Sequence, residues 1–275
     1  MPGPYASLGP MMALALNRFA DAVPLMQKAV ELDPGDPGGA TALAMVYRNL
    51  GDESKSLATI EQAARRWPDD WGIQISLAVI DLFRGDSAGT VRHAERSLAL
   101  YARNPWALVL LRNADLQSGR DTDTLARYRK AYPELFVQGA PRLDLLNYGV
   151  SVDLALVLQK RGDTARANVL LDAAEQAIGK LPRLGLGGYG ITDVQIHALR
   201  GDKVKALAAL REASMAGWRL YWRYARDFDP NLASIRNEPE FKAVFADIER
   251  DMARQRAELA ARPKDAPLNL GEPVK

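Results

Sequence analysis

The sequence of 275 residues contains no cysteine and only two histidines, His93 and His197. Without cysteine there are no disulfide bonds and no cysteine-ligated zinc sites, and the redox compartment is left open. No stretch approaches 18 consecutive apolar residues, so no transmembrane helix is predicted. The segment Met1 to Tyr5 lacks the charged and apolar regions of a signal peptide.

The chain also lacks a marked excess of charge of either sign. It has 36 Lys and Arg against 34 Asp and Glu, for a net charge of +2. Such a balance gives no electrostatic reason to expect nucleic acid or an anionic membrane as a partner. The composition is ordinary for a soluble protein, and we expect a soluble chain in the cytoplasm or the periplasm.

What the sequence does contain is a recurring Gly-Asp step. Gly51, Gly85 and Gly119 are 34 residues apart, and Gly162-Asp163 and Gly201-Asp202 repeat the step further along. A period of this length is typical of a solenoid built from two-helix units. We expect the glycine to form the turn between the helices and the aspartate to cap the second helix.

Small residues recur in phase with these turns and with Asn17. They stand five and twelve residues after each turn, which places them on one helix face and allows a neighbouring helix to approach closely. The two sets are Ala22, Ser56, Thr90, Thr124, Ala167 and Ala206, and Ala29, Ala63, Ser97, Ala131, Ala174 and Ala213.

This pattern resembles the tetratricopeptide repeat over roughly residues 8–217. The best copy carries the family positions Leu43, Ala44, Tyr47, Ser56, Ala63 and Pro68. The resemblance implies an all-α fold, a right-handed α-solenoid of about five to six helix pairs with a C-terminal capping helix. We divide the chain into the repeat array (8–216), an aromatic junction with the capping helix (217–262) and a disordered tail (263–275).

Two features depart from a regular array. The intervals from Gly119 to Gly162 and from Gly162 to Gly201 are 43 and 39 residues, and we place the extra residues in loops between units. The first unit looks incomplete, with Pro10 inside its first helix, and a solenoid end normally carries a polar cap. We therefore hypothesise that the chain is the C-terminal part of a longer protein.

Three constellations bear on catalysis. Residues 185–190 match G-x-G-x-x-G, but no strand precedes them, which favours a loop over a dinucleotide site. Asp81 and Asp115 occupy equivalent repeat positions, and Arg112 is placed to neutralise Asp115, which favours ion pairs over acid–base chemistry. The two histidines lie on different helices. We predict no catalytic, cofactor or metal site and a chain that is not an enzyme.

Aromatic residues crowd the end of the array. Trp218, Tyr221 and Trp222, with Tyr224 and Phe228, suit either packing of the cap or contact with a ligand or partner. Residues 217–241 also resemble a segment that closes the repeats of bacterial signalling proteins, including CadC-type winged-helix regulators, adenylate cyclases and serine/threonine kinases. That resemblance implies a sensor or docking module.

In the tetratricopeptide family the first helix of each pair lines a concave groove. By phase with Leu43, this implies a partner-binding groove of apolar and amide side chains, suited to a peptide backbone. Its predicted contact residues are Thr41, Met45, Arg48, Asn49, Val79, Asn113, Gln117, Gln159 and Gln195. Thr41 and Met45 replace the Lys and Asn of the family's chaperone-tail clamp, so that ligand is not supported.

We thus expect a protein–protein interaction scaffold of a bacterial signalling or regulatory protein, which binds a protein or peptide in its groove. The alternative is a ligand-sensing regulatory domain of a membrane-bound transcription regulator or cyclase. The sequence leaves the oligomeric state open.

Overall fold

The computed structural model describes residues 3–263 and 266–267, and within them every regular element is helical. Most of the predicted tail, 263–275, lies outside the described residues. Six helix pairs follow one another, and a short segment and a long helix complete the chain. The pairs are α1 (Gly3–Leu16) and α2 (Phe19–Leu32), α3 (Pro37–Asn49) and α4 (Glu53–Arg66), α5 (Trp71–Arg84) and α6 (Ser87–Leu100), α7 (Pro105–Gln117) and α8 (Asp121–Ala131), α9 (Tyr148–Lys160) and α10 (Thr164–Ile178), and α11 (Thr192–Leu199) and α12 (Lys203–Met215). After them come α13 (Trp222–Asp227), η2 (Pro230–Leu232) and α14 (Pro239–Ala261).

The turns between paired helices follow the predicted chemistry. The five turn glycines have φ between 70° and 83°, and Asn17 has φ 55° in the first pair. These φ values lie in the left-handed region, which glycine adopts without steric cost and asparagine tolerates. Asp52, Asp86, Asp163 and Asp202 then cap α4, α6, α10 and α12 by accepting the backbone N–H three residues on.

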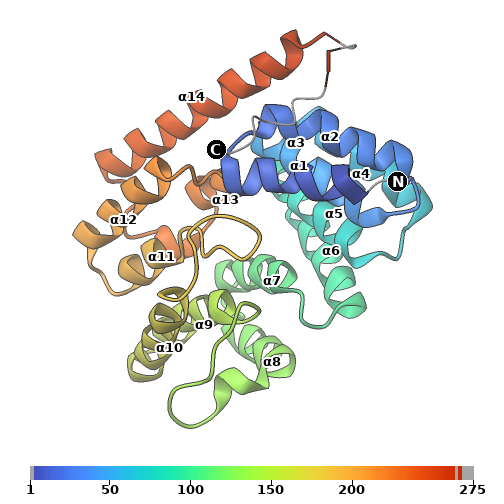
Figure 1. The fold of residues 1–275 in the computed structure, drawn as a ribbon. Coiled ribbons are helices and arrows are strands. Elements are labelled where there is room, and N and C mark those ends of the chain that lie inside the picture. Colours follow the sequence, from blue (N-terminus) through green and yellow to red (C-terminus); the bar gives the residue numbers. More distant parts are fainter. Residues whose placement is uncertain (1–2, 264–265, 268–275) are drawn as a thin grey trace.

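The predicted small positions lie at the helix contacts. All twelve are buried, the most exposed being Ala29 at 8%. Their size lets paired helices pack closely, and successive pairs stack through α3 on α5 and α5 on α7. The all-α solenoid predicted from the repeat is confirmed (Figure 1).

The stretched intervals fall between pairs, as predicted. The first holds the 3₁₀ helix η1 (Pro133–Phe136) and an irregular segment before α9. The second, between α10 and α11, is the glycine-rich loop, and the Gly185 N–H reaches across to the Leu14 carbonyl of α1 at 3.1 Å. The G-x-G-x-x-G stretch is therefore a loop between helices.

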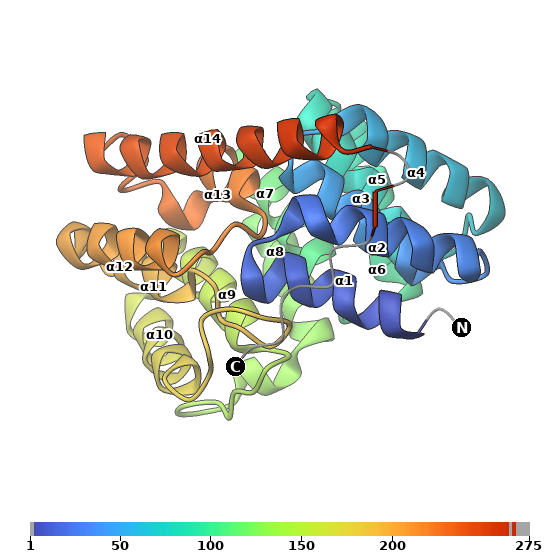
Figure 2. The same cartoon turned by 45° about the horizontal axis from the view of Figure 1, so that its top comes forward.

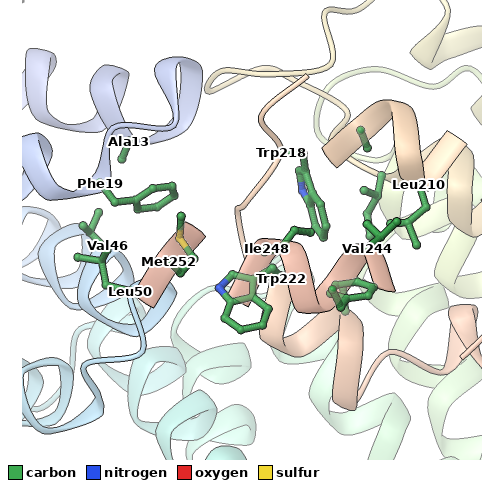
Figure 3. Close-up of a cluster of buried hydrophobic side chains, with 14 of the residues drawn as sticks. Ala13, Phe19, Val46, Leu50, Leu210, Trp218, Trp222, Val244, Ile248 and Met252 are labelled. Carbon is green, nitrogen blue, oxygen red and sulfur yellow. The ribbon is translucent and has the colours of Figure 1, made fainter. Parts of the chain in front are cut away.

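The capping helix α14 joins the two ends of the array. It runs from α12 past α13 to α2, so that the last and first pairs share one helix (Figures 1 and 2). Figure 3 shows the shared core. Phe19 and Val46 of the first two pairs lie near Met252 of α14, and Leu210 of α12 lies near Val244, further along the same helix. Part of the apolar surface of α2 is thus covered by α14.

Candidate functional site

The chain's own C-terminal segment lies along the predicted groove. Residues 218–232, which we call the groove segment, contain α13 and η2 and contact first helices of successive pairs. Its aromatic rings meet rings of those helices: Phe228 packs edge-on against Phe83 of α5 at 5.2 Å between centroids, and Tyr221 against Trp106 of α7 at 4.4 Å. Tyr221, a predicted partner contact, therefore packs against the chain's own helix α7.

Asn49, at the end of α3, holds the start of the groove segment. Its Oδ1 accepts the Tyr221 N–H at 2.8 Å, and its carbonyl accepts the Trp222 Nε1–H at 2.8 Å. Tyr221 has φ 55°, a left-handed conformation that is costly for an aromatic residue. The amide of Asn49 thus stabilises a bend which the backbone alone would not favour.

Asn113 and Gln195 bind the segment further along. Asn113 Nδ2 donates to the Tyr224 hydroxyl at 2.9 Å and to the Phe228 carbonyl at 3.4 Å. Gln195 Nε2 donates to Asp229 Oδ2 at 2.6 Å. Asn113 thus contacts a backbone carbonyl of the chain itself, whereas Gln195 contacts a side-chain carboxylate.

The remaining predicted contact residues are divided between the core and the surface. Val79 joins an apolar cluster with Tyr224 and Phe228, and Met45 packs against the main core. Thr41 donates to the Gly38 carbonyl, Gln159 donates to the Leu199 carbonyl at 3.1 Å, and Gln117 is exposed. Arg48 is buried beside the groove segment at 8% exposure.

A buried polar network lies beneath the segment. The fully enclosed Arg112 side chain pairs with Asp153 of α9, and Asn231 Nδ2 donates to the same Asp153 oxygen at 2.8 Å. Burial raises the pKa of Asp229, and the nearby Arg112 only partly offsets this. The predicted Arg112–Asp115 pair is wrong: Arg112 reaches across to α9, while Asp115 binds Arg127, Arg120 and the Thr124 hydroxyl.

One cleft remains open between the groove segment and the irregular loops. It has a volume of about 330 Å³ and lies between the N-terminal ends of α7 and α9, the glycine-rich loop and α13. Aromatic residues dominate its wall, Gln195 and two carboxylates face it, and Leu145 and Leu146 stand at its edge with exposures of 56% and 70%. The aromatic and carboxylate residues that line it are Trp106, Tyr148, Tyr189, Trp218, Tyr221, Tyr224, Asp153 and Asp229.

This cleft, which we call the central cleft, unites features that the sequence treated separately. Three predicted residues line it: Gln195, Trp218 and Tyr221. Trp222 instead lies in the core, 3% exposed. Sequence reasoning missed Asp153 and the Leu145–Leu146 pair. The available signal was their position, because Leu145 and Leu146 fall in the first stretched interval and are apolar residues in a loop.

The described residues show few features of a reactive centre. Among them, no group of three or more His, Asp or Glu side chains is placed to hold a metal ion. Asp81 Oδ2 lies 3.7 Å from His93 Nε2. Burial raises the pKa of Asp81, and the positive groups nearby offset only part of this rise. Both histidines are half-buried helix residues. Within the same residues, no helix has the length and hydropathy needed to cross a membrane.

Comparison with known proteins finds a family match over part of the chain. Residues 13–79 match the tetratricopeptide repeat family. No curated protein matches the chain. Among solved structures, the Cut9–Hcn1 hetero-tetramer of APC/C is similar with a TM-score of 0.53 at 13% identity over 87% of this chain. The chain spans only 44% of that protein.

A second structure, pilF of Pseudomonas aeruginosa, is similar with a TM-score of 0.50 at 15% identity, over 90% of this chain and 97% of that one. At such low identity these two likenesses concern the fold alone, and they agree with the helix pairs described above. Residues 13–79 are therefore similar in sequence to the tetratricopeptide repeat family, and further helix pairs follow them along the chain.

Proposed function

We propose that this chain is a non-enzymatic interaction scaffold that binds a segment of a partner protein in the central cleft. The observation that carries the proposal is the cleft itself: about 330 Å³, walled by aromatic rings and edged by exposed leucines, at the middle of a repeat groove. Apolar walls with a few converging polar groups are typical of ligand sites. Exposed leucines at such an edge mark an interaction surface better than leucines scattered singly.

The charge of the cleft favours a basic partner. The charged residues that line it are Asp153 and Asp229, with no lysine or arginine among the lining side chains. Arg112, whose side chain is fully buried, pairs with Asp153, whereas Asp229 forms no ion pair among the described residues and accepts a hydrogen bond from Gln195. A lysine or arginine that enters between the aromatic rings would gain both ion pairing and cation–π attraction. We therefore propose a partner segment that carries a basic residue next to apolar ones.

The groove segment limits where that partner binds. Asn49, Asn113 and Val79 are engaged by the chain itself, so contact through them would require the segment to leave. The central cleft needs no such displacement. Gln195, Trp218 and Tyr221 are the predicted contact residues that we retain for the first contact.

The test is binding of an array of hexapeptides that combine one basic residue with apolar ones. Leu146→Lys, at a site 70% exposed, should remove binding without disturbing the core, because it takes away an apolar contact and repels a basic peptide. Val204→Lys on α12, a site 80% exposed and away from the cleft, is the matched control and should bind like the parent protein. Equal binding by both variants would overturn the proposal.

A second candidate is a ligand-sensing regulatory domain of a bacterial signalling protein. It is favoured by the aromatic segment, because Trp218, Tyr221 and Tyr224 all line the same cleft and resemble the closing segment of such regulators. A thermal-shift screen distinguishes the two. A small molecule that raises the melting temperature, with the effect lost in Tyr221→Ala, would favour sensing over peptide binding.

A further inference from the structure

Arg48 carries a buried positive charge that no carboxylate neutralises among the described residues. Its side chain is 8% exposed, and its Nη1 has no hydrogen-bond partner there. Burial lowers the pKa of Arg48, Tyr221 offsets part of this, and the neighbouring cation Arg223 lowers the pKa further. A buried guanidinium without a counter-charge is costly, so the site favours an anion.

Other unpaired donors stand beside it. The Ser56 hydroxyl on α4, 2% exposed, has no partner among the described residues, and neither has Arg223 Nη1. Arg48 and Ser56 both line a hollow of about 220 Å³ at the ends of α3 and α5, together with Ser54, Phe83 and Arg84. That volume far exceeds the roughly 10–15 Å³ that one water molecule requires.

The charge around this hollow is positive. Arg48 and Arg84 line it, and Glu53 is the acidic residue of its lining. Glu53 is already paired with Arg223, whose Nη2 lies 2.6 Å from its Oε1. The hollow also adjoins the first turn of α4, where the helix dipole favours negative charge.

We propose that the hollow binds a phosphoryl oxyanion, held by the Arg48 guanidinium and the Ser56 hydroxyl. Guanidinium groups match phosphate oxygens with two parallel hydrogen bonds, and a tetrahedral anion accepts the hydroxyl at the same time. The phosphoryl group comes from free inorganic phosphate or from a phosphorylated side chain of a bound protein. The site is separate from the central cleft and does not depend on the function proposed there.

The test is titration calorimetry with inorganic phosphate at constant ionic strength. Arg48→Met, which keeps the side-chain length without the charge, should weaken binding about ten- to hundredfold. Ser56→Ala should weaken it by up to about tenfold. Arg65→Met, at an exposed position of the same helix as Ser56, is the matched control and should bind like the parent protein.

A thermal readout separates binding from a structural role. Phosphate should raise the melting temperature of the parent more than that of Arg48→Met, and this difference cancels the general stabilisation that phosphate gives all proteins. In phosphate-free buffer Arg48→Met should melt no lower than the parent, because an unpaired buried charge has been removed.

Absence of phosphate binding by the parent would overturn the inference, as would equal binding by the parent, Arg48→Met and Ser56→Ala. If Arg48→Met fails to fold, Ser56→Ala and the exposed-site variant Arg84→Gln decide, and unchanged affinity in both refutes the site. A phosphoserine peptide forms a second arm. Tighter binding of that peptide than of inorganic phosphate assigns the site to a phosphorylated side chain, and the reverse assigns it to the free ion.

Discussion

The closure of the array depends on Gln255, and this yields the sharpest prediction. The first pair has Asn17 and Arg18 where four of the five other turns have Gly and Asp, and Arg18 gives α2 no side-chain cap. Gln255 of α14 supplies it from 236 residues away: its Oε1 accepts the Phe19 N–H at 2.8 Å and the Ala20 N–H at 3.3 Å. Its Nε2 donates to the Asn17 carbonyl at 2.9 Å.

We expect Gln255→Met to lower the free energy of unfolding by about 2–3 kcal/mol. The residue is 4% exposed, so methionine fills the space while the Phe19 and Ala20 N–H groups lose their acceptor. A missing helix cap costs about 1 kcal/mol, and a buried group left without a partner costs about 1–3 kcal/mol. At about 2–4 °C per kcal/mol for a chain of this size, the melting temperature should fall by about 4–12 °C.

Thermal denaturation followed by circular dichroism measures the effect. Glu258→Gln, an exposed site on the same helix, is the matched control and should stay within about 0.5 kcal/mol of the parent. Hydrogen exchange should show faster exchange of the Phe19 amide in Gln255→Met than in the control. A melting temperature equal to that of Glu258→Gln would refute the reasoning.

A local cap should replace the distant one. Arg18 has φ −108° and ψ 62°, close to the backbone of Asp163, which caps α10 at φ −84° and ψ 62°. Arg18→Asp in the Gln255→Met background should therefore recover about 1 kcal/mol. The double variant should therefore melt at a higher temperature than Gln255→Met alone. An equal or lower melting temperature would contradict the local cap.

Two further predictions concern the turns and the buried carboxylate. Gly85→Ala should lower the free energy of unfolding by about 1 kcal/mol in urea denaturation, because φ is 77°. The added Cβ meets no atom within 4 Å, so backbone strain alone is measured. Gly149→Ala, in a helix with equal space, should be neutral or stabilising, and the opposite order of stabilities would contradict this. Asp229, whose pKa burial raises, binds its proton more tightly when folded, so its contribution to stability is full below the ordinary pKa of about 4 and is lost as pH rises through the folded value. Asp229→Asn should remove that part of the pH dependence of the melting temperature.

The repeat could be predicted because its information is local. The Gly-Asp turns, the small residues five and twelve positions later and the loops in the stretched intervals each depend on a few neighbouring residues. They repeat in phase, so one misread position does not change the result. The capping helix was also local, since its apolar residues Phe241, Phe245 and Ile248 follow helical spacing and are buried.

The contacts that close the array could not be predicted in the same way. Whether α14 reaches α2 depends on the summed rotation of six pairs, and a small change in each rotation moves the end of the array by a large distance. Gln255 gives no sign in the sequence that it will cap a helix near residue 19. Likewise Arg112 has Asp115 one turn away, yet it pairs with Asp153 of the next first helix.

The groove residues show why the chemistry of a groove can leave its occupant open. Amide side chains at Asn49 and Asn113 were expected to bind a peptide backbone, and they do bind one: the Tyr221 N–H and the Phe228 carbonyl. The groove cannot distinguish an external segment from one tethered to its own array, because the hydrogen bonds are the same. The tether decides, since a covalently linked segment has a high effective concentration that a free peptide must match. A partner therefore gains most where the segment leaves space, and the central cleft, bounded by Tyr221 and Gln195, is such a place.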